Sequence, residues 1–462
     1  MHSKIRTSCL FVIAFLCAAT LYAGGETALD RYVAAPDSHY KYELVKTISG
    51  DGYTAFILDL TSQQWRTAAE VNHPIWKHWL TIVRPSQVKS STGFLFITGG
   101  SIGDPPPEKL DPSTVEMATS THSVTAELRD VPNEPLVFPD DGKERDEDAI
   151  IAYSWDKYLK GGDDNWPLRL PMTKSAVRAM DTITAFSKSA QGGGLNVDHF
   201  VVAGGSKRGW TTWTTAAVDK RVIAIAPLVI DLLNAEQSFD HHYRAYGFWA
   251  PAIKDYVDMH IMDWTGTKRY HELMKIEEPY SYRDRLTMPK YIVNASGDQF
   301  FLPDSSQFYW SGLKGQKYLR YVPNTGHSLK GTDVRESVLA YYQSVVDGTP
   351  RPELDWRFEK DGSIRVVTKT KPTEVKLWQA TDPNARDFRV DTIGKAYTST
   401  PLTDQGGGVY VANVKAPPKG WTAFFIELTY PMGQHNMKIT SGVRVTPDTL
   451  PFGPPPRPML KK

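Results

Sequence analysis

The chain has 462 residues, of which 41% are hydrophobic, 23% charged and 11% aromatic. This composition is typical of folded globular proteins and excludes collagen-like, low-complexity and largely disordered chains. Lysine and arginine number 53 and aspartate and glutamate 52, so the net charge is +1 and no nucleic-acid partner is expected. The length corresponds to about three domains of about 150 residues, or fewer if one is a large α/β domain.

Residues 1–23 have the pattern of a secretory signal peptide. Lys4 and Arg6 precede an apolar run from Cys9 to Leu21, and Ala23 stands before the expected cleavage point. The run has 13 residues, whereas a membrane-spanning helix needs about 20. We expect a secreted or periplasmic protein with no membrane span in the mature chain; an uncleaved N-terminal anchor is the alternative.

The cysteine and histidine patterns limit the chemistry. Both cysteines, Cys9 and Cys17, lie in the predicted signal peptide, so the mature chain would have none. Disulfides, thiolate catalysis and Cys-ligated zinc are then excluded. No His-Glu-x-x-His or comparable ligand spacing occurs either, so we expect no metal and no cofactor.

Strand-like and helix-like segments alternate within residues 24–350. The expected strands are residues 80–83, 94–97, 200–203, 222–229, 291–294 and 318–322, and the expected helices are 175–189, 210–218 and 337–346. This alternation predicts an α/β domain with a mostly parallel sheet covered by helices on both faces.

Other segments depart from this alternation. Residues 101–174, rich in Pro, Asp and Trp, and the aromatic residues 231–287 are expected to be insertions that form a cap above the sheet. Short strand-like runs within residues 352–448, with a hairpin turn at Asp361-Gly362, predict a small all-β, sandwich-like module. Residues 449–462 form a proline-rich tail.

The strongest local signal for chemistry is the segment FVVAGGSKRGW, residues 200–210. A strand ends in two glycines, Ser206 follows, and a helix begins after it, a turn that projects the serine hydroxyl above the sheet. The common pattern is Gly-x-Ser-x-Gly, and Arg208 replaces its last glycine. The alternatives are a packing turn or a phosphate-binding loop, although the full P-loop pattern is absent.

A catalytic serine needs a base and an acid that orients the base. In this architecture the order along the chain is serine, acid, histidine. Asp298 follows the expected strand 291–294, and His327 follows the expected strand 318–322. We therefore predict that Ser206, Asp298 and His327 meet at the carboxyl edge of the sheet, with Asp304 as the alternative acid.

Acyl transfer also needs donors for a developing oxyanion. One predicted donor is the backbone N–H of Lys207, directly after the serine. The second is predicted in the glycine-rich turn after the expected strand 94–97, at Gly100 or Ser101. An ordinary strand-to-loop turn is the alternative for that segment.

Two groups of residues in the expected cap are candidate substrate ligands. The acidic stretch, Glu144, Asp146, Glu147 and Asp148, could hold a substrate ammonium group as in an aminopeptidase-like or dipeptidyl-peptidase-like site, or it could be a solvated loop. The cap tryptophans, chiefly Trp155 and Trp249 together with Trp166 and Trp264, could stack on a saccharide or aryl ester, or pack within the cap. For His241, His242 and His260 we expect cap packing.

Longer motifs show a family resemblance. The segment 204–234, which begins GGSKRGWTTW, resembles the PhoPQ-activated pathogenicity-related protein family, as do SGDQFFLPD at 296–304, NTGH at 324–327 and WLTIVRP at 79–85. The resemblance spans roughly residues 30–445. It implies an α/β-hydrolase fold in exported or cell-surface proteins and makes Arg208 part of the family's own Ser-Lys-Arg-Gly turn. It implies no particular substrate.

Two functions are open at this point. The first is a secreted serine hydrolase that cleaves an ester or amide bond, possibly in a peptide, through an acyl-enzyme, with a small-molecule, peptide or saccharide ester as substrate. The second is a non-catalytic secreted signalling or binding protein built on a hydrolase scaffold. The sequence does not determine the oligomeric state.

Overall fold

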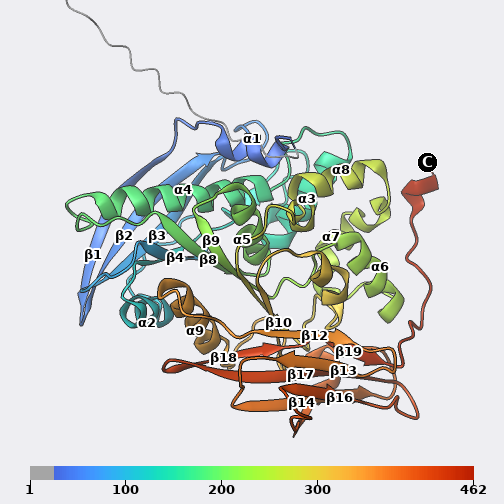
Figure 1. Ribbon diagram of the computed structural model, residues 1–462. Coiled ribbons are helices and arrows are strands. Elements are labelled where there is room, and N and C mark those ends of the chain that lie inside the picture. Colours follow the sequence, from blue (N-terminus) through green and yellow to red (C-terminus); the bar gives the residue numbers. More distant parts are fainter. Residues whose placement is uncertain (1–24, 462) are drawn as a thin grey trace, which may run out of the picture.

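The protein is described here by a computed structural model that covers residues 25–461 (Figure 1). The predicted signal peptide, residues 1–23, lies outside the described residues. Within residues 25–461, no helix is both long enough and apolar enough to cross a membrane.

In the described part of the chain the central sheet has nine strands. Their spatial order is β1 (Lys41–Gly50), β2 (Tyr53–Gln64), β3 (Ile75–Pro85), β5 (Thr125–Leu128), β4 (Thr92–Ile97), β8 (His199–Gly205), β9 (Val222–Leu228), β10 (Lys290–Ala295) and β11 (Lys317–Val322). The strands from β5 to β11 are parallel, whereas β3 is antiparallel to both of its neighbours and β1 is antiparallel to β2. From β2 onward this order, with its single reversed strand, is that of the α/β-hydrolase fold.

Helices cover both faces of the sheet (Figure 1). On one side lie α1 (Ala28–Ala34), α4 (Arg169–Lys188) and α5 (Lys207–Val218), and on the other lie α2 (Pro112–Thr121) and α9 (Val334–Val346). Side chains alternate between the two faces of the sheet along β8. Phe200 and Val202 pack into one hydrophobic cluster, and Val201 and Ala203 pack into another. A strand buried on both faces reads as a continuous apolar run, which explains why its position was predictable.

A helical cap lies beside the carboxyl ends of these strands. It comprises α3 (Glu147–Leu159), α6 (Ala235–Tyr246), α7 (Lys254–Asp258) and α8 (Lys268–Glu277), joined by short 3₁₀ turns, η1 (Pro251–Ile253), η2 (Ile261–Trp264) and η3 (Pro279–Tyr282). Because α3 packs against α7 and α8, the two cap segments form one layer. Two further turns, η4 (Ser305–Phe308) and η5 (Trp310–Gly312), follow β10, and β6 (Leu136–Val137) pairs with β7 (Glu144–Arg145).

One expectation about the hydrolase domain needs correction, and one hairpin of the central sheet was not predicted. Residues 101–174 are not a single insertion, because they contain helix α2 and the central-sheet strand β5. The strand is only four residues long and reads Thr-Ala-Glu-Leu, which gives little β signal. The long β1–β2 hairpin was not predicted, since β1 is mostly exposed and polar and is held by pairing with β2.

The C-terminal part is all-β, as expected, and has two antiparallel sheets. One contains β12 (Leu354–Phe358), β13 (Ile364–Thr368) and β16 (Val409–Ala412). The other contains β15 (Thr398–Pro401), β14 (Glu374–Asp382), β17 (Trp421–Met432) and β18 (His435–Thr440), with β19 (Arg444–Thr446) paired to β17. The short helical turn α10 (Val390–Ile393) lies within this part, whereas the C-terminal turn η6 (Pro458–Lys461) contacts η2 of the cap.

This β-module is docked on the hydrolase domain rather than tethered to it. Strand β18 contacts both β11 and α9. The Tyr291 hydroxyl donates to the carbonyl of Lys438 at 2.6 Å, and the Tyr321 N–H donates to Thr440 Oγ1 at 3.0 Å. The strands that carry the predicted acid and base loops, β10 and β11, therefore touch the C-terminal module (Figure 1).

Candidate active site

Ser206 occupies a sharp turn between β8 and α5. Its backbone has φ 55° and ψ −123°, a conformation that a residue with a side chain rarely adopts. The turn is fixed by hydrogen bonds from the Ser206 N–H to the Leu228 carbonyl at 2.8 Å and from the Trp210 N–H to the Ser206 carbonyl at 3.0 Å. Gly204 is required, because a Cβ there would lie 2.6 Å from the Arg208 carbonyl oxygen. The result is the sharp strand-to-helix turn that the sequence predicts at Ser206.

Asp298 and His327 are joined directly. The Nδ1 atom of His327 lies 3.0 and 2.9 Å from the two carboxylate oxygens of Asp298. Asp298 is buried and also accepts the Phe300 N–H at 2.8 Å, while the His327 N–H donates to the Gln299 side chain at 2.9 Å. A carboxylate on Nδ1 leaves Nε2 of the same imidazole available to act as a base.

The alternative acid, Asp304, has different partners. It lies 3.0 Å from His241 Nε2 and accepts from Arg386 at 2.6 Å. Burial acts to raise the pKa of Asp304, but Arg386 and His241 outweigh it and hold that pKa well below its usual range. Asp304 is therefore part of a buried ionic cluster, and the acid in contact with His327 is Asp298.

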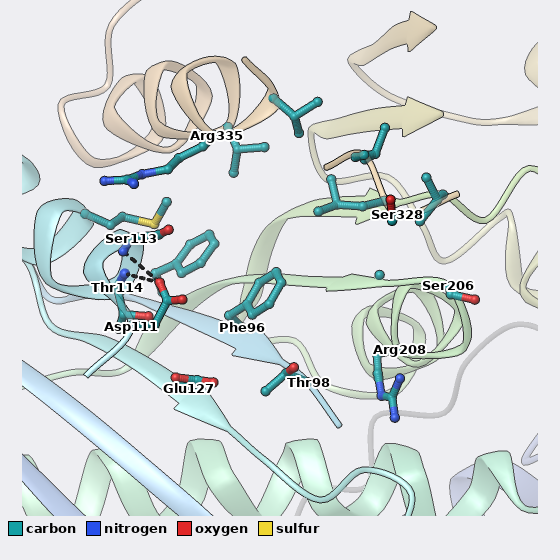
Figure 2. Close-up of a pocket in the computed structure, with 18 of the residues that line it drawn as sticks. Phe96, Thr98, Asp111, Ser113, Thr114, Glu127, Ser206, Arg208, Ser328 and Arg335 are labelled. Carbon is teal, nitrogen blue, oxygen red and sulfur yellow. Dashed lines mark hydrogen bonds between the residues drawn. The ribbon is translucent and has the colours of Figure 1, made fainter. Parts of the chain in front are cut away.

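Ser206 and His327 line the same cavity, which has a volume of about 520 Å³. Figure 2 shows Ser206 and Ser328, the residue after His327, near one end of it. Among the described residues no hydrogen bond joins the Ser206 hydroxyl to His327. Catalytic hydrogen bonds are often long in unliganded enzymes and tighten only when substrate binds. Both residues thus line one cavity, without a hydrogen bond between them.

The predicted oxyanion donors have different environments. Helix α5 begins at Lys207, so the N–H of that residue is one of the first amides, which have no acceptor within the helix. The Ser101 N–H already donates to Asp104 at 2.9 Å. Gly100 has φ 156°, and a Cβ there would lie 2.1 Å from an oxygen of Asp130, so only glycine fits. Of the two candidates in that loop, Gly100 is the one whose amide is not already used by Asp104.

The acidic stretch contributes to an ionic network with Lys207 and Arg208, the two residues that follow Ser206. Glu147 accepts from Lys207 Nζ at 2.7 Å and from Arg208 at 2.9 Å, and Asp148 lies 3.2 Å from Lys207 Nζ. Burial acts to raise the pKa of Glu147, but the two cations outweigh it and lower the pKa to about 2. Glu144 is instead exposed on β7, and Asp146 precedes α3 as its N-cap residue. The charges closest to Ser206 are therefore already compensated.

The cap tryptophans divide in a similar way. Trp155 is buried, donates its indole N–H to Glu277 and lines a small space next to Ser206. Trp249 packs against Phe239 and Tyr243 of α6. Trp166 lies under the Arg66 guanidinium at 4.2 Å from the ring centre, and Trp264 is partly buried in the core. Of these tryptophans, Trp155 is the one that the structure places next to Ser206.

The cap histidines also have different settings. His241 and His242 are buried in α6, as cap packing predicts. His242 accepts the Ala250 N–H at 3.0 Å, and burial lowers its pKa to about 3. His260 is exposed and lies 3.3 Å from Asp263. Within residues 25–461, no group of three or more His, Cys, Asp or Glu residues is arranged to hold a metal ion.

Comparison with known proteins adds the family. A family model described as PhoPQ-activated pathogenicity-related protein matches residues 29–389. The chain belongs to this family. A curated relative, Autocrine proliferation repressor protein A of Dictyostelium discoideum, is 39% identical over an alignment of 457 residues, and the match covers 92% of each chain.

Solved structures similar to this family member include two acetyl xylan esterases. Acetyl xylan esterase 1 from Thermoanaerobacterium sp. JW/SL YS485 has 13% identity and a TM-score of 0.48, and covers 69% of this chain and 91% of its own. The enzyme from Paenibacillus sp. R4 has 16% identity and a TM-score of 0.44, with the same shares of the two chains. The strand order of the central sheet, described above, identifies the fold of this protein.

Sequence reasoning missed two residues, Glu134 and Arg169, that contact the residues following Ser206. Glu134 lies 3.4 Å from Arg208 and accepts the Glu147 N–H at 2.6 Å, and burial raises its pKa to about 7. Arg169 lies 4.0 Å over the Trp210 ring and donates to the Lys207 carbonyl at 3.2 Å. Neither residue stands in a recognisable motif, because both reach these residues only through the folded chain.

The C-terminal module also contributes to the site, through residues 386–397. Within that segment the Val390 N–H donates to the Gly297 carbonyl at 2.9 Å, next to Asp298. Asn324, three residues before His327, exchanges two hydrogen bonds with the backbone of Tyr397, at 2.8 and 2.9 Å. The segment 386–397 therefore holds the loops of both Asp298 and His327.

Proposed function

We propose that this family member is a serine hydrolase that cleaves an ester or amide bond through an acyl-enzyme formed on Ser206. The observation that carries the proposal is the hydrogen-bonded pair of Asp298 and His327. His327 lines the same cavity as Ser206, which lies on a strained turn. A merely structural serine turn does not need a carboxylate-oriented imidazole at the same cavity.

In the proposed reaction His327 Nε2 takes the proton of the Ser206 hydroxyl as the oxygen attacks the substrate carbonyl. Asp298 holds the imidazole through Nδ1 and stabilises its positive charge. The backbone N–H groups of Lys207 and Gly100 would donate to the developing oxyanion. His327 then gives its proton to the leaving group, and water, activated by the same histidine, releases the acid and restores the serine.

A fluorophosphonate probe tests the proposal directly. The folded protein should be labelled at Ser206, and Ser206→Ala should abolish labelling and lower turnover on the order of 10⁴-fold or more. His327→Ala should also prevent labelling, while circular dichroism and the denaturation midpoint show that both variants remain folded. If the wild-type protein is not labelled, or if Ser206→Ala is labelled equally, the hydrolase proposal is wrong.

We propose further that the protein is exported, on the basis of the predicted signal peptide. Expression of the full chain with its N-terminus, followed by mass spectrometry of the exported product, should give a mature protein that begins after Ala23. Retention of residues 1–23, or recovery only from the cytoplasm, would contradict export.

A signalling function is the second candidate, because the relative's name describes an autocrine repressor of proliferation. A non-catalytic signal would not depend on the nucleophile. If a growth assay responds to this protein, the hydrolase proposal expects Ser206→Ala to lose the response. An unchanged response would favour a binding function on a hydrolase scaffold.

A further inference from the structure

Ser206 lies between two spaces of very different size. On one side is the cavity of about 520 Å³, which is within the range of pockets that bind small-molecule ligands. On the other side, beneath the cap, Ser206 lines a space of about 30 Å³ together with Trp155, Trp210 and Tyr256. A single water occupies about 10–15 Å³ on this measure, so the second space admits only a very small group.

The wall of the larger cavity is mainly apolar. Its apolar residues come from β4, α2, the end of β9, the loop after His327 and α9: Phe94, Phe96, Met117, Leu228, Val229, Leu329, Val334 and Val338. Phe94 and Phe96 are two positions apart on β4, so their side chains face the same side of the sheet. Such a wall gains free energy by taking apolar surface out of water.

The charged groups around this cavity already have partners. Figure 2 shows Asp111 and Arg335 at the end opposite to Ser206, with Phe96 between the two ends. The Asp111 carboxylate accepts the Ser113 N–H at 2.7 Å as the cap of α2, and Arg335 is paired with Glu116. Glu127 accepts from Arg129 at 3.1 Å. An uncharged ligand matches a cavity in which these charged groups already have partners within the protein.

Backbone strain marks the same cavity. Besides Ser206, two of its lining residues have a positive φ: Val229 at 44° and Leu329 at 52°. Such a conformation is a true outlier for a β-branched residue, and strain of this kind concentrates at functional sites. The cavity is thus built by conformations that cost free energy, which is not expected of a packing defect.

We propose that the 520 Å³ cavity binds the large apolar part of the substrate, an alkyl or aryl group, and that the space beneath the cap accepts only a methyl- or ethyl-sized group. This inference rests on the proposed hydrolase function and narrows it to uncharged esters with one large apolar side and one small side. The large side belongs either to the acid or to the alcohol, and the experiment distinguishes the two.

The test uses two ester series with the full-length protein. One contains methyl esters of acids of increasing chain length, and the other contains acetate esters of alcohols of increasing chain length. In one series kcat/KM should rise about threefold to fourfold for each added methylene until the cavity is filled, and in the other it should fall. No length dependence in either series would overturn the inference, as would an equal rise in both.

Variants locate the effect. Val338→Phe should narrow the cavity and lower kcat/KM for the longest preferred ester at least tenfold, while methyl acetate stays within twofold. Phe96→Ala should widen the cavity and shift the optimum to a longer chain. Val346→Phe, the same substitution on α9 outside the cavity lining, is the matched control and should leave the length profile unchanged. Equal losses for short and long esters in Val338→Phe would contradict the assignment.

A second readout separates this inference from the proposed function. Fluorophosphonates with a methyl or a decyl arm label the serine without turnover, and the long arm should react at least tenfold faster. Labelling at Ser206 that does not depend on arm length would leave the hydrolase proposal standing and overturn the cavity assignment. Absence of any labelling would overturn both.

Discussion

Ser206, the proposed nucleophile, and the proposed acid–base pair of Asp298 and His327 are held in different ways. The turn around Ser206 is built by neighbours in sequence: β8, α5 and glycines at which a side chain would strike the backbone. The loops of Asp298 and His327 are instead held by residues 386–397, which belong to the C-terminal module. The comparison indicates that the serine geometry is local, whereas its alignment with the base depends on how a second module docks.

The largest effect is expected from replacing each of the two candidate acids by asparagine. Asp298→Asn should lower kcat on the order of 10⁴-fold with little change in stability, because the amide no longer favours the correct tautomer of His327. Asp304→Asn should instead destabilise the fold by about 3–5 kcal/mol, since it leaves the buried Arg386 without its carboxylate. Turnover and urea denaturation of both variants measure the contrast. Similar kinetic losses in two equally stable variants would contradict the separate roles.

The contact between the module and the base loop can be broken at Asn324. Asn324→Ala removes two hydrogen bonds to Tyr397 and also strains a backbone that has φ 58°, so kcat should fall roughly tenfold to a hundredfold. Asn324→Gly removes the same bonds without the strain and should have the smaller effect. The rate of fluorophosphonate labelling depends on the alignment of His327 with Ser206, and it can be measured without a known substrate. Unchanged labelling in both variants would show that the module does not position the base.

The backbone strain at Ser206 can be measured as a difference in the free energy of unfolding between two variants. Ser206→Gly should be more stable than Ser206→Ala by about 1–2 kcal/mol, because glycine adopts φ 55° without steric cost. Denaturant unfolding of the two inactive variants gives the difference. The same pair at Ser328, which does not have a positive φ, should favour alanine or show no difference. If Ser206→Gly were no more stable than Ser206→Ala, the turn would not be strained.

The smallest expected effect is a pH dependence of protein stability that comes from the ion pairs of Glu147 with Lys207 and Arg208. The pKa of Glu147 falls from 4.5 to about 2 in the folded protein, so the stability it contributes is present above about pH 4.5 and is lost as the pH falls toward 2. Because its side chain is 46% exposed, solvent screening limits this contribution to about 1 kcal/mol. Glu147→Gln should lower stability at pH 7 and differ little from wild type near pH 2.

Glu144→Gln on β7 is the control for this measurement, because Glu144 is an exposed glutamate of the same acidic stretch. Denaturation midpoints of both variants at the two pH values are compared. A Glu147→Gln loss that is the same at both pH values would mean that charge pairing is not its cause.

Much of the hydrolase domain was predictable because its buried strands and helices leave local signals. The strands β8, β9, β10 and β11 are apolar runs and were expected at the positions where they occur. Strand β5 and the β1–β2 hairpin were not predicted. A four-residue strand and an exposed edge strand are stabilised by pairing rather than by their own periodicity.

The sequence alone therefore determined the unit of β8, Ser206 and α5, and the order in which candidate acid and base follow it. These depend on short-range patterns: an apolar run, small residues at a turn, and a helix start. Only the tertiary structure decided that Asp298 rather than Asp304 contacts His327, that Glu147 is paired with Lys207 and Arg208, and that residues 386–397 hold the acid and base loops. Contacts between residues far apart in sequence depend on how whole elements pack, and no local pattern records that packing.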